Sequence, residues 1–299
     1  MATHSSVLAW RIPGTGQEVG HNKYKIDRLT DEFDKVGVQM SVLVNDGTLA
    51  KIENNNTCLN FEADFVVYLD KDNYLARFIE KAGIRMFNKA DFIKLCDDKV
   101  LTYIECSNRG IRMPKTFAGP LMYREPHNDD YLFLNTVIKE LGFPMIVKKV
   151  YGSLGEGVYL VNNYKELANL YADIYRNPIL FQQYIASSYG RSLRILVIDG
   201  KVFGGFVRFN HADFRSNYGD TADGATIENS ERYFAFAQEI ADKLNIEYAG
   251  IDLVFDENED PILCEINSNA FFEEFEKVTG LNVAKAIVAM ILKKMANHE

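Results

Sequence analysis

The first third of the chain alternates predicted helices with predicted strands, and this alternation limits its fold more than any other feature. Apolar runs between turn residues predict strands, whereas apolar residues at helical spacing predict helices. Such an order is typical of a small α/β unit with a parallel sheet. The expected elements are a helix, two strands and a helix, with a candidate first strand before them: Ile26–Val36, Val38–Val44, Phe65–Leu69, Tyr74–Ala82 and Val7–Ile12.

The remaining two thirds divide into a second α/β region and a strand-rich region. After a helix at Asp98–Arg109, the second region is expected to hold two helices and three strands: Leu132–Leu141, Pro144–Lys148, Val158–Val161, Tyr164–Tyr175 and Ile179–Tyr184. Asp199-Gly200 is a type I′ turn signal between two strands of the third region. Two hairpins and two covering helices are expected there: Leu193–Ile198 with Val202–Phe209, Tyr248–Phe255 with Pro261–Asn267, Glu231–Leu244 and Val283–Ala296.

Composition argues against several classes of protein. The 299 residues allow two or three compact subdomains, and 47% hydrophobic with 25% charged residues is an ordinary globular mixture. The net charge of −9 argues against a broad nucleic-acid-binding surface. The four cysteines form no CxxC pair, which predicts reduced thiols and no zinc site. Since the chain has no transmembrane run and no signal-peptide core, we expect a cytoplasmic protein with neither nucleic acid nor membrane as its partner.

Three polar residues interrupt the apolar strands of the second predicted hairpin. Asp252 lies within one strand, while Glu265 and Asn267 lie two apart on the other and therefore share a face. A carboxylate that is buried among apolar side chains needs a compensating positive charge. Two carboxylates and an amide oxygen suit Mg²⁺, which takes few protein oxygens together with substrate phosphates. A polar hairpin end with solvated acids explains this segment equally well.

A glycine-rich segment, Gly152–Gly157, connects two predicted strands and follows a lysine at the end of an apolar strand. The dinucleotide fingerprint and the Walker loop both need a helix after the glycines, so neither fits here. Glycines let backbone N–H groups approach a phosphate closely, although most glycine hairpins are purely structural. Lys148 favours the phosphate, because a lysine in an apolar strand is costly to bury without an anion.

Three further cations are candidates for the same anion or for charge that develops in a reaction. Lys99 follows two acids at a predicted helix start, where a surface lysine is the simpler interpretation. Arg208 ends a strand, and Arg215 follows in a polar loop. The planar fork of arginine suits phosphate and carboxylate, so both could stabilise a transferred phosphoryl group or a tetrahedral carbon. Taken singly, such arginines are more often solvated loop residues than catalytic ones.

The order of these features is more specific than any one of them. A lysine, a lysine before a glycine hairpin, an arginine loop and an Asp…Glu-x-Asn hairpin follow one another along the chain. In this order the chain resembles the ATP-grasp superfamily and, within it, the RimK-type α-L-glutamate ligases. The resemblance covers roughly Phe65 to Ala296. It is carried by Asn88–Lys99, Phe143–Lys148, Gly152–Gly157, Ile179–Ile185, Asp213–Asn217, Ala249–Asp252, Cys264–Asn267 and Glu276–Gly280.

The resemblance implies an ATP-grasp fold, of class α/β with α+β lobes, behind an N-terminal α/β pre-ATP-grasp domain. That domain would span residues 1–95, and the ATP-grasp domain would comprise a central lobe at 96–185 and a C-terminal lobe at 186–299. The resemblance further implies an ADP-forming carbon–nitrogen ligase, which activates a carboxylate as an acylphosphate that an amine then attacks. Its substrates would be small-molecule or peptide carboxylates and amines, with glutamate as the inherited candidate, and a homo-oligomer is left open.

Carried over residue by residue, the resemblance also implies a site for ATP and Mg²⁺ or Mn²⁺. Lys99 and Lys148 would hold the phosphates beneath the glycine hairpin, represented by Gly152, Ser153, Gly155 and Gly157. Further nucleotide contacts would come from the backbone of Gln183 and Tyr184 at the adenine edge, and from Ser192, Arg215, Ser216 and Asn217. Asp252, Glu265 and Asn267 would bind the metal. Arg208 and Arg215 would stabilise the acylphosphate and the tetrahedral intermediate.

The chain departs from the family pattern at four places. Ser192 replaces a common aspartate, and Gln183 replaces a common glutamate. The acidic Tyr218–Ala225 and the segment Ser268–Phe272 replace the usual Arg-Gly-Gly and Ala-Ser-Pro-Gly sequences. Phosphate and metal positions survive, whereas the loops on the acceptor side differ. The acidic loop favours a basic acceptor peptide, and the departures leave open a non-catalytic ATP-binding module that acts as a regulator or scaffold.

Overall fold

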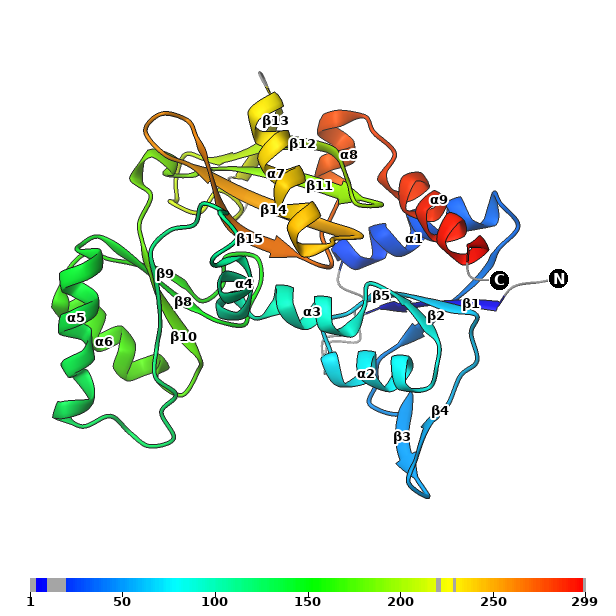
Figure 1. Cartoon of the computed structure of the whole chain (residues 1–299), viewed down its shortest axis with the longest axis horizontal. Coiled ribbons are helices and arrows are strands. Elements are labelled where there is room, and N and C mark those ends of the chain that lie inside the picture. Colours follow the sequence, from blue (N-terminus) through cyan, green and yellow to red (C-terminus); the bar gives the residue numbers. More distant parts are fainter. Residues whose placement is uncertain (1–3, 10–19, 219–221, 228–229, 298–299) are drawn as a thin grey trace.

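The structure is a computed structural model that describes residues 4–9, 20–218, 222–227 and 230–297. Within these ranges the strands form three larger sheets, of four, four and five strands, and one separate hairpin (Figure 1). The chain passes through the three larger sheets in sequence order. The domain boundaries at residues 95 and 185 stay a prediction. Among the described helices, none has the length and apolar content needed to span a bilayer.

The first sheet is parallel, as the alternation of helices and strands predicts. Its order is β2-β1-β5-β6, with β1 at His4–Ala9, β2 at Gln39–Val44, β5 at Phe65–Leu69 and β6 at Arg85–Phe87. Helices α1 (Gly20–Asp34) and α2 (Asn73–Lys81) belong to the same part of the chain. The strand predicted at Val7–Ile12 begins later than β1, and residues 10–12 lie outside the described part of the chain.

Several short elements of this region were not predicted. They are a hairpin of β3 (Ala50–Glu53) and β4 (Asn56–Leu59), strand β6, and helix α3 (Ala90–Asp97). The helix predicted at Asp98–Arg109 is α4, at Lys99–Cys106. Asp98 caps its start by accepting a hydrogen bond from the Leu101 N–H at 2.9 Å. The helix ends earlier than predicted, because Ser107 has extended backbone angles.

The second sheet is antiparallel and presents one face to two helices. Val147 and Phe181 pack on that face against α5 (Leu132–Leu141) and α6 (Tyr164–Ile174). Because side chains alternate along a strand, Lys148 points to the opposite face, away from the helices. The order is β7-β10-β8-β9, with β7 at Thr116–Ala118, β8 at Met145–Lys149, β9 at Val158–Val161 and β10 at Ile179–Gln183.

The third sheet is antiparallel and contains both predicted hairpins, β11–β12 and β14–β15. Helix α7 (Glu231–Leu244) covers one face, and α8 (Glu273–Thr279) and α9 (Val283–Ala296) cover part of the other (Figure 1). The order is β13-β12-β11-β14-β15, with β11 at Arg191–Ile198, β12 at Lys201–Asn210, β13 at Ala222–Thr226, β14 at Tyr248–Phe255 and β15 at Pro261–Asn267.

One apolar core joins the first and third sheets. Helix α1 contributes Leu29 and Phe33, which are 1% and 0% exposed. They cluster with Phe206 of β12, Phe275 of α8 and Val288 of α9. Figure 1 shows α1 beside α9, between the two sheets. The N-terminal third therefore completes the core of the C-terminal third and does not pack only on itself.

Candidate functional site

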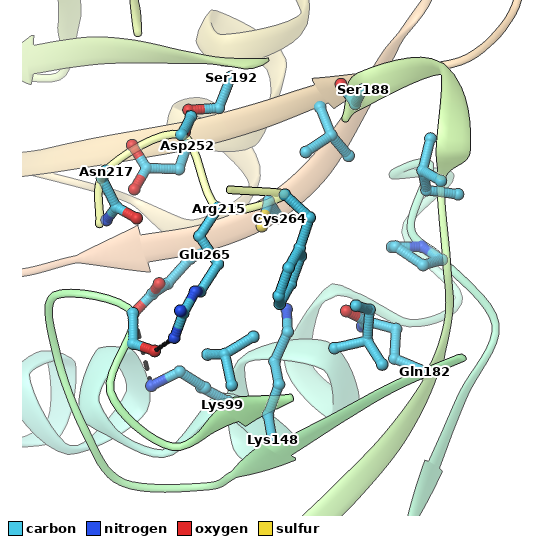
Figure 2. Close-up of a pocket in the computed structure, with 18 of the residues that line it drawn as sticks. Lys99, Lys148, Gln182, Ser188, Ser192, Arg215, Asn217, Asp252, Cys264 and Glu265 are labelled. Carbon is cyan, nitrogen blue, oxygen red and sulfur yellow. Dashed lines mark hydrogen bonds and ion pairs between the residues drawn. The ribbon is translucent and has the colours of Figure 1, made fainter. Parts of the chain in front are cut away.

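A pocket lies between the second and third sheets, beside the connection from β8 to β9 (Figure 2). Most residues that were singled out from the sequence line it. They are Lys99, Lys148, Gly152, Ser153, Gly155, Gln183, Tyr184, Ser192, Arg208, Arg215, Ser216, Asn217, Asp252 and Glu265. Gly157 and Asn267 were also singled out, but neither belongs to this lining as far as the described residues define it.

The glycine-rich segment connects two antiparallel strands, as its position in the sequence predicts. β8 pairs with β9, and the Lys149 N–H donates to Gly157 O at 2.8 Å. Gly155 has a φ of +74°, and a Cβ at this position would lie 3.3 Å from Arg215 Cδ. Arg215 Nη1 in turn donates to Gly155 O at 3.0 Å. The missing side chain at Gly155 thus lets the glycine hairpin pack directly on the loop that carries Arg215.

Two lysines from different elements place buried ammonium groups in this pocket. Lys148 of β8 and Lys99 of α4 are each 8% exposed. Lys99 Nζ donates to Gly152 O at 2.9 Å and lies 3.5 Å from Glu265 Oε1. Lys148 Nζ has no hydrogen-bond or ion-pair partner among the residues that the structure describes. The interpretation of Lys99 as a surface lysine is therefore wrong, and two buried cations in one pocket favour an anionic ligand.

A row of residues across the third sheet carries the charged centre of the pocket. The strand register aligns Arg194 of β11 with Asp252 of β14, and Asp252 with Glu265 of β15. Arg194 Nη2 donates to Asp252 Oδ2 at 2.7 Å, and Arg208 Nη2 of β12 donates to Asp252 Oδ1 at 2.5 Å. Burial alone would raise the pKa of Asp252, but the two arginines hold this pKa below its ordinary value. Asp252 is therefore not a solvated acid.

Two guanidinium groups in this cluster contact one carboxylate directly. Arg194 and Arg208 are 8% and 6% exposed, and they share the single carboxylate of Asp252, which is 6% exposed. The buried Nε atom of Arg208 has no hydrogen-bond partner within the described ranges. An unused guanidinium donor suits an incoming phosphate or carboxylate oxygen. Arg208 is a buried strand residue, so its interpretation as a solvated loop arginine is wrong.

The predicted metal ligands lie close together, but their oxygen atoms are not equally available. Asn267 Nδ2 donates to Asp252 Oδ2 at 3.3 Å, in addition to the two arginines. Both oxygens of Asp252 are thus engaged, which leaves Glu265 and Asn267 Oδ1 as the better donors. The described part of the chain contains no group of three or more His, Cys, Asp or Glu side chains that could hold a metal ion by themselves. The donors therefore fit an ion such as Mg²⁺ that also takes oxygens from phosphates and water.

The loop after β12 holds Arg215 from several sides. Arg215 Nε and Nη2 donate to the Asp213 carboxylate at 2.9 and 2.8 Å, and the guanidinium lies 3.3 Å from the centre of the Tyr218 ring. The hydroxyl oxygens of Ser192 and Ser216 lie 2.6 Å apart, which links this loop to β11. Residues 219–221 of the acidic loop lie outside the described residues.

Sequence reasoning missed Arg194 as a site residue, although a signal was present. Arg194 interrupts the apolar run Leu193–Ile198 in the same way that Lys148 ends an apolar strand. Arg194 acts on the site through Asp252, whereas Gln182 and Cys264 line the pocket itself, and neither of these two carries such a signal. Gln182 Nε2 donates to Thr116 Oγ1 at 2.8 Å, so this contact depends on the pairing of β10 with β7.

Comparisons with known proteins find one family and several relatives. A family model described as a RimK-like ATP-grasp domain matches residues 97–291. The "uncharacterized protein MG012 homolog" of Mycoplasma pneumoniae is 30% identical over 79% of this chain and 83% of that protein. Human beta-citrylglutamate synthase B is 30% identical over 74% of this chain and 56% of that protein. The "probable alpha-L-glutamate ligase 2" of Pseudoalteromonas atlantica is 27% identical over 91% of this chain and 92% of that protein.

Solved structures share the fold at lower sequence identity. A RimK domain protein, ATP-grasp, from Sphaerobacter thermophilus has a TM-score of 0.71 at 18% identity, over 96% of this chain and 98% of that chain. The D-alanine–D-alanine ligase of Bacillus anthracis, in its complex with ATP, has a TM-score of 0.74 at 17% identity over 100% of both chains. The arrangement of the sheets is therefore an ATP-grasp fold, as the sequence predicts.

Proposed function

The chain belongs to the RimK-like ATP-grasp family, and we propose that it is an ATP-dependent ligase that joins a carboxylate to an amine with release of ADP and phosphate. The observation that carries this proposal is the pair of buried lysines, Lys99 and Lys148, in the pocket beside the glycine hairpin. Buried cations in a pocket need an anion, and a nucleotide triphosphate supplies several negative charges. Relatives named as ligases and synthases support the same class of reaction.

The nucleotide would lie between the second and third sheets. Lys99 and Lys148 would hold its phosphates under the glycine hairpin, and the backbone of Gln183 and Tyr184 would meet the adenine edge. The side chain of Gln183 is exposed. A contact made by the backbone does not use this side chain, so glutamine can stand where the family commonly has glutamate. Ser192, Ser216 and Asn217 complete the set of proposed nucleotide contacts, and all three line the pocket.

Glu265 and Asn267 would hold Mg²⁺, and Asp252 would join them on releasing one of its arginine contacts. When bound, the ion would neutralise phosphate charge and orient the terminal phosphoryl group. The residues of the chain would then position the two substrates around that group. Arg208 and Arg215 would stabilise the negative charge that develops on the transferred phosphoryl group and on the reacting carbon.

The proposed reaction proceeds in two steps. An oxygen of the substrate carboxylate attacks the γ-phosphorus of ATP, and the bond from this phosphorus to ADP breaks. The amine then attacks the carbonyl carbon of the resulting acylphosphate, and the bond from this carbon to the phosphate oxygen breaks. The products are an amide, inorganic phosphate, ADP and a proton. Positioning and charge stabilisation by the chain contribute to both steps.

For the amine substrate we propose glutamate, and for the carboxylate substrate a small polar acid. The names of human beta-citrylglutamate synthase B and of the Pseudoalteromonas alpha-L-glutamate ligase both refer to glutamate. The unused Nε donor of Arg208 supports an anionic carboxylate substrate. Because the chain spans only 56% of the human synthase, the identity of the acid is left to experiment.

A non-catalytic ATP-binding regulator or scaffold is the second candidate function. One observation favours it: the hydroxyl of Ser192 is bound to Ser216, at a position where the family commonly has an aspartate. Such a protein would bind ATP but would not release ADP in response to an amine and a carboxylate.

Release of ADP from Mg-ATP distinguishes the two candidates. L-glutamate with a mixture of citrate and other small carboxylates should stimulate ADP release over ATP alone. Lys148→Met should abolish this stimulation, whereas Lys149→Met, on the opposite face of β8, should retain it. Tight ATP binding without stimulated release, also when peptides replace glutamate, would reject the ligase and favour the regulator.

A further inference from the structure

Helix α8 carries three carboxylates in its first turn, and two of them have structural partners. Glu273 pairs with Lys277 at 2.7 Å, and Glu276 accepts a hydrogen bond from the Tyr24 hydroxyl at 2.6 Å. Glu274 has no hydrogen bond or ion pair among the described residues. Within the described residues, Glu274 is thus the one carboxylate of this turn that makes neither kind of contact.

Glu274 lies beside Arg208, on the same face of the third sheet. Strands β12 and β13 pair Arg208 with Gly224, and a Cβ added to Gly224 would lie 3.0 Å from Glu274 Oε1. Directly paired residues send their side chains to the same face, with Cβ atoms about 5 Å apart. The Glu274 carboxylate therefore occupies the space that a side chain at position 224 would fill, next to the stem of Arg208.

Arg208 connects this carboxylate to the pocket. It is 6% exposed, its Nη2 is bound to Asp252, and its Nε has no hydrogen-bond partner in the described part of the chain. The register continues from Gly224 through Arg208 to Ser192, which lines the pocket. Glu274 thus lies at the Gly224 end of this row of paired residues, and Ser192 at the other end lines the proposed nucleotide site. The guanidinium of Arg208, with its unused donor, belongs to the middle residue.

Charged groups on the neighbouring strands act on Glu274. The side chain of Glu274 is exposed, but the surrounding protein partly desolvates its carboxyl and so raises its pKa above the ordinary value; two arginines oppose this rise, and two aspartates add to it. A carboxylate with a raised pKa accepts a proton more readily near neutral pH. The groups concerned are Arg194, Arg208, Asp223 and Asp252 on the strands, while Tyr24 and Arg28 of α1 are bound to Glu276.

We propose that Glu274 binds the ammonium group of the amine substrate and removes its proton before the amine attacks the acylphosphate. The proposal rests on the ligation described above. An ammonium nitrogen has no lone pair, so its proton must leave before a C–N bond forms. A carboxylate oxygen of Glu274 accepts this proton, and the nitrogen attacks the carbonyl carbon. Phosphate then leaves from that carbon and takes up the second proton that the nitrogen loses. Glu274 then returns the proton to solvent. Arg208 holds the oxygens of the acylphosphate on the opposite side of the reacting carbon.

Two nucleophiles that differ in protonation test this role, in the presence of Mg-ATP and the carboxylate mixture. Glutamate carries an ammonium group at neutral pH, whereas hydroxylamine is largely neutral and converts acylphosphates into hydroxamates. Glu274→Gln should lower kcat/KM for glutamate about 100-fold and leave the rate of hydroxamate formation within about twofold of the wild-type rate. Glu273→Gln, on the same helix turn, is the matched control and should change neither rate.

The pH profile separates a base from a packing residue. In the wild type, protonation of Glu274 should contribute to the decline of kcat/KM for glutamate at low pH. This contribution should be absent from the profile of Glu274→Gln and partly present in that of Glu274→Asp. The thermal midpoint of Glu274→Gln should stay close to that of the wild type, because within the described residues this carboxylate has no hydrogen bond or ion pair to lose.

The outcomes distinguish this role from the ligation itself. An equal loss with both nucleophiles, or no loss with glutamate, would overturn the role of Glu274 and leave the ligation supported. A wild-type protein that forms no hydroxamate and shows no glutamate-dependent release of ADP would overturn the ligation, and the role of Glu274 with it.

Discussion

Asp252 shares one buried carboxylate between the guanidinium groups of Arg194 and Arg208. A buried ion cluster of this kind contributes little net stability compared with apolar residues of the same size. Removing one member, however, leaves buried charges without compensation. The cluster therefore makes Asp252 important for stability as well as for the proposed metal site, and a variant at this position affects both.

Asp252→Asn should lower the free energy of unfolding by about 3–5 kcal/mol, because two buried guanidinium groups lose their counter-charge. Urea denaturation measures this change. Glu259→Gln is the control, since its ion pair with Arg191 is much more exposed, at 44% and 37% of the two side chains. The control should change the free energy by less than about 1 kcal/mol. Equal effects in the two variants would contradict the assignment of a buried ion cluster.

Lys25 is a buried lysine whose ammonium is bound by Asn269 and, among the described residues, by no acid. Burial, with a smaller contribution from Arg194, lowers the pKa of Lys25 from 10.5 to about 7. Between these two values the unfolded chain binds a proton that the folded chain lacks. The contribution of this group to the free energy of unfolding therefore rises with pH between them and is constant below pH 7.

Lys25→Met should raise the free energy of unfolding at pH 7 and flatten its dependence on pH. The wild type must bury a charged ammonium or release its proton when it folds, and methionine does neither. Urea denaturation of the wild type and the variant at pH 7 and pH 9 measures the difference. The two proteins should differ more at pH 7 than at pH 9. A difference that is independent of pH would show that Lys25 has an ordinary pKa.

The glycine hairpin between β8 and β9 is held by residues from three other parts of the chain. Lys71, which follows β5, donates from Nζ to Ser153 Oγ at 3.0 Å. Lys99 of α4 binds Gly152 O, and Arg215 of the loop after β12 binds Gly155 O. The glycine hairpin thus contacts the first region of the chain, helix α4 and the third region. A change in its backbone should therefore affect nucleotide binding more than global stability.

Gly155→Ala should raise the KM for ATP about tenfold, which corresponds to about 1.4 kcal/mol of strain in the closed hairpin. A Cβ at this position would meet Tyr218 Cδ2 at 3.2 Å and Arg215 Cδ at 3.3 Å, at a φ of +74°. Gly83→Ala is the matched control, because its φ is +87° and a Cβ there would have no described atom within 4 Å. The control Gly83→Ala should lower the thermal midpoint without changing the KM for ATP. An unchanged KM in Gly155→Ala would contradict the tight packing at Gly155.

Sequence patterns predicted the elements with long apolar runs or strong turn signals. Both hairpins of the third sheet, β8, β10 and α7 lie where those patterns place them. Two of the strands that were missed, β6 and β7, have three residues each. Such a strand is too short to show an alternating pattern. It exists because a longer neighbour pairs with it, β5 in one case and β10 in the other.

At the scale of the whole molecule, the core shared by the first and third sheets links the two ends of the chain. The resemblance implies a separate N-terminal domain, and the structure adds that its helix α1 packs into the same apolar cluster as α8 and α9. Glu276 of α8 reinforces this contact through Tyr24 and Arg28 of α1. Unfolding of the two parts should therefore be coupled.

Leu29→Ala should lower the free energy of unfolding by about 2–5 kcal/mol, because Leu29 is fully packed in the shared core. Its side chain is 1% exposed, whereas that of Val36, the control position, is 51% exposed. Urea denaturation followed by far-ultraviolet circular dichroism and by tyrosine fluorescence should show one common transition. Two separated transitions would contradict a shared core.

The sequence by itself determined the family, most of the elements and most of the residues that line the pocket. Apolar periodicity and closely spaced motifs are properties of short segments, and they can be recognised without knowing how distant parts of the chain pack. The tertiary structure alone decided which charges meet. Arg194 and Asp252 lie 58 residues apart. Glu274 lies near Arg208 because Gly224 of β13, which pairs with Arg208, leaves room for its carboxylate. Which side chains share a face depends on the pairing and register of strands, and no local pattern specifies these.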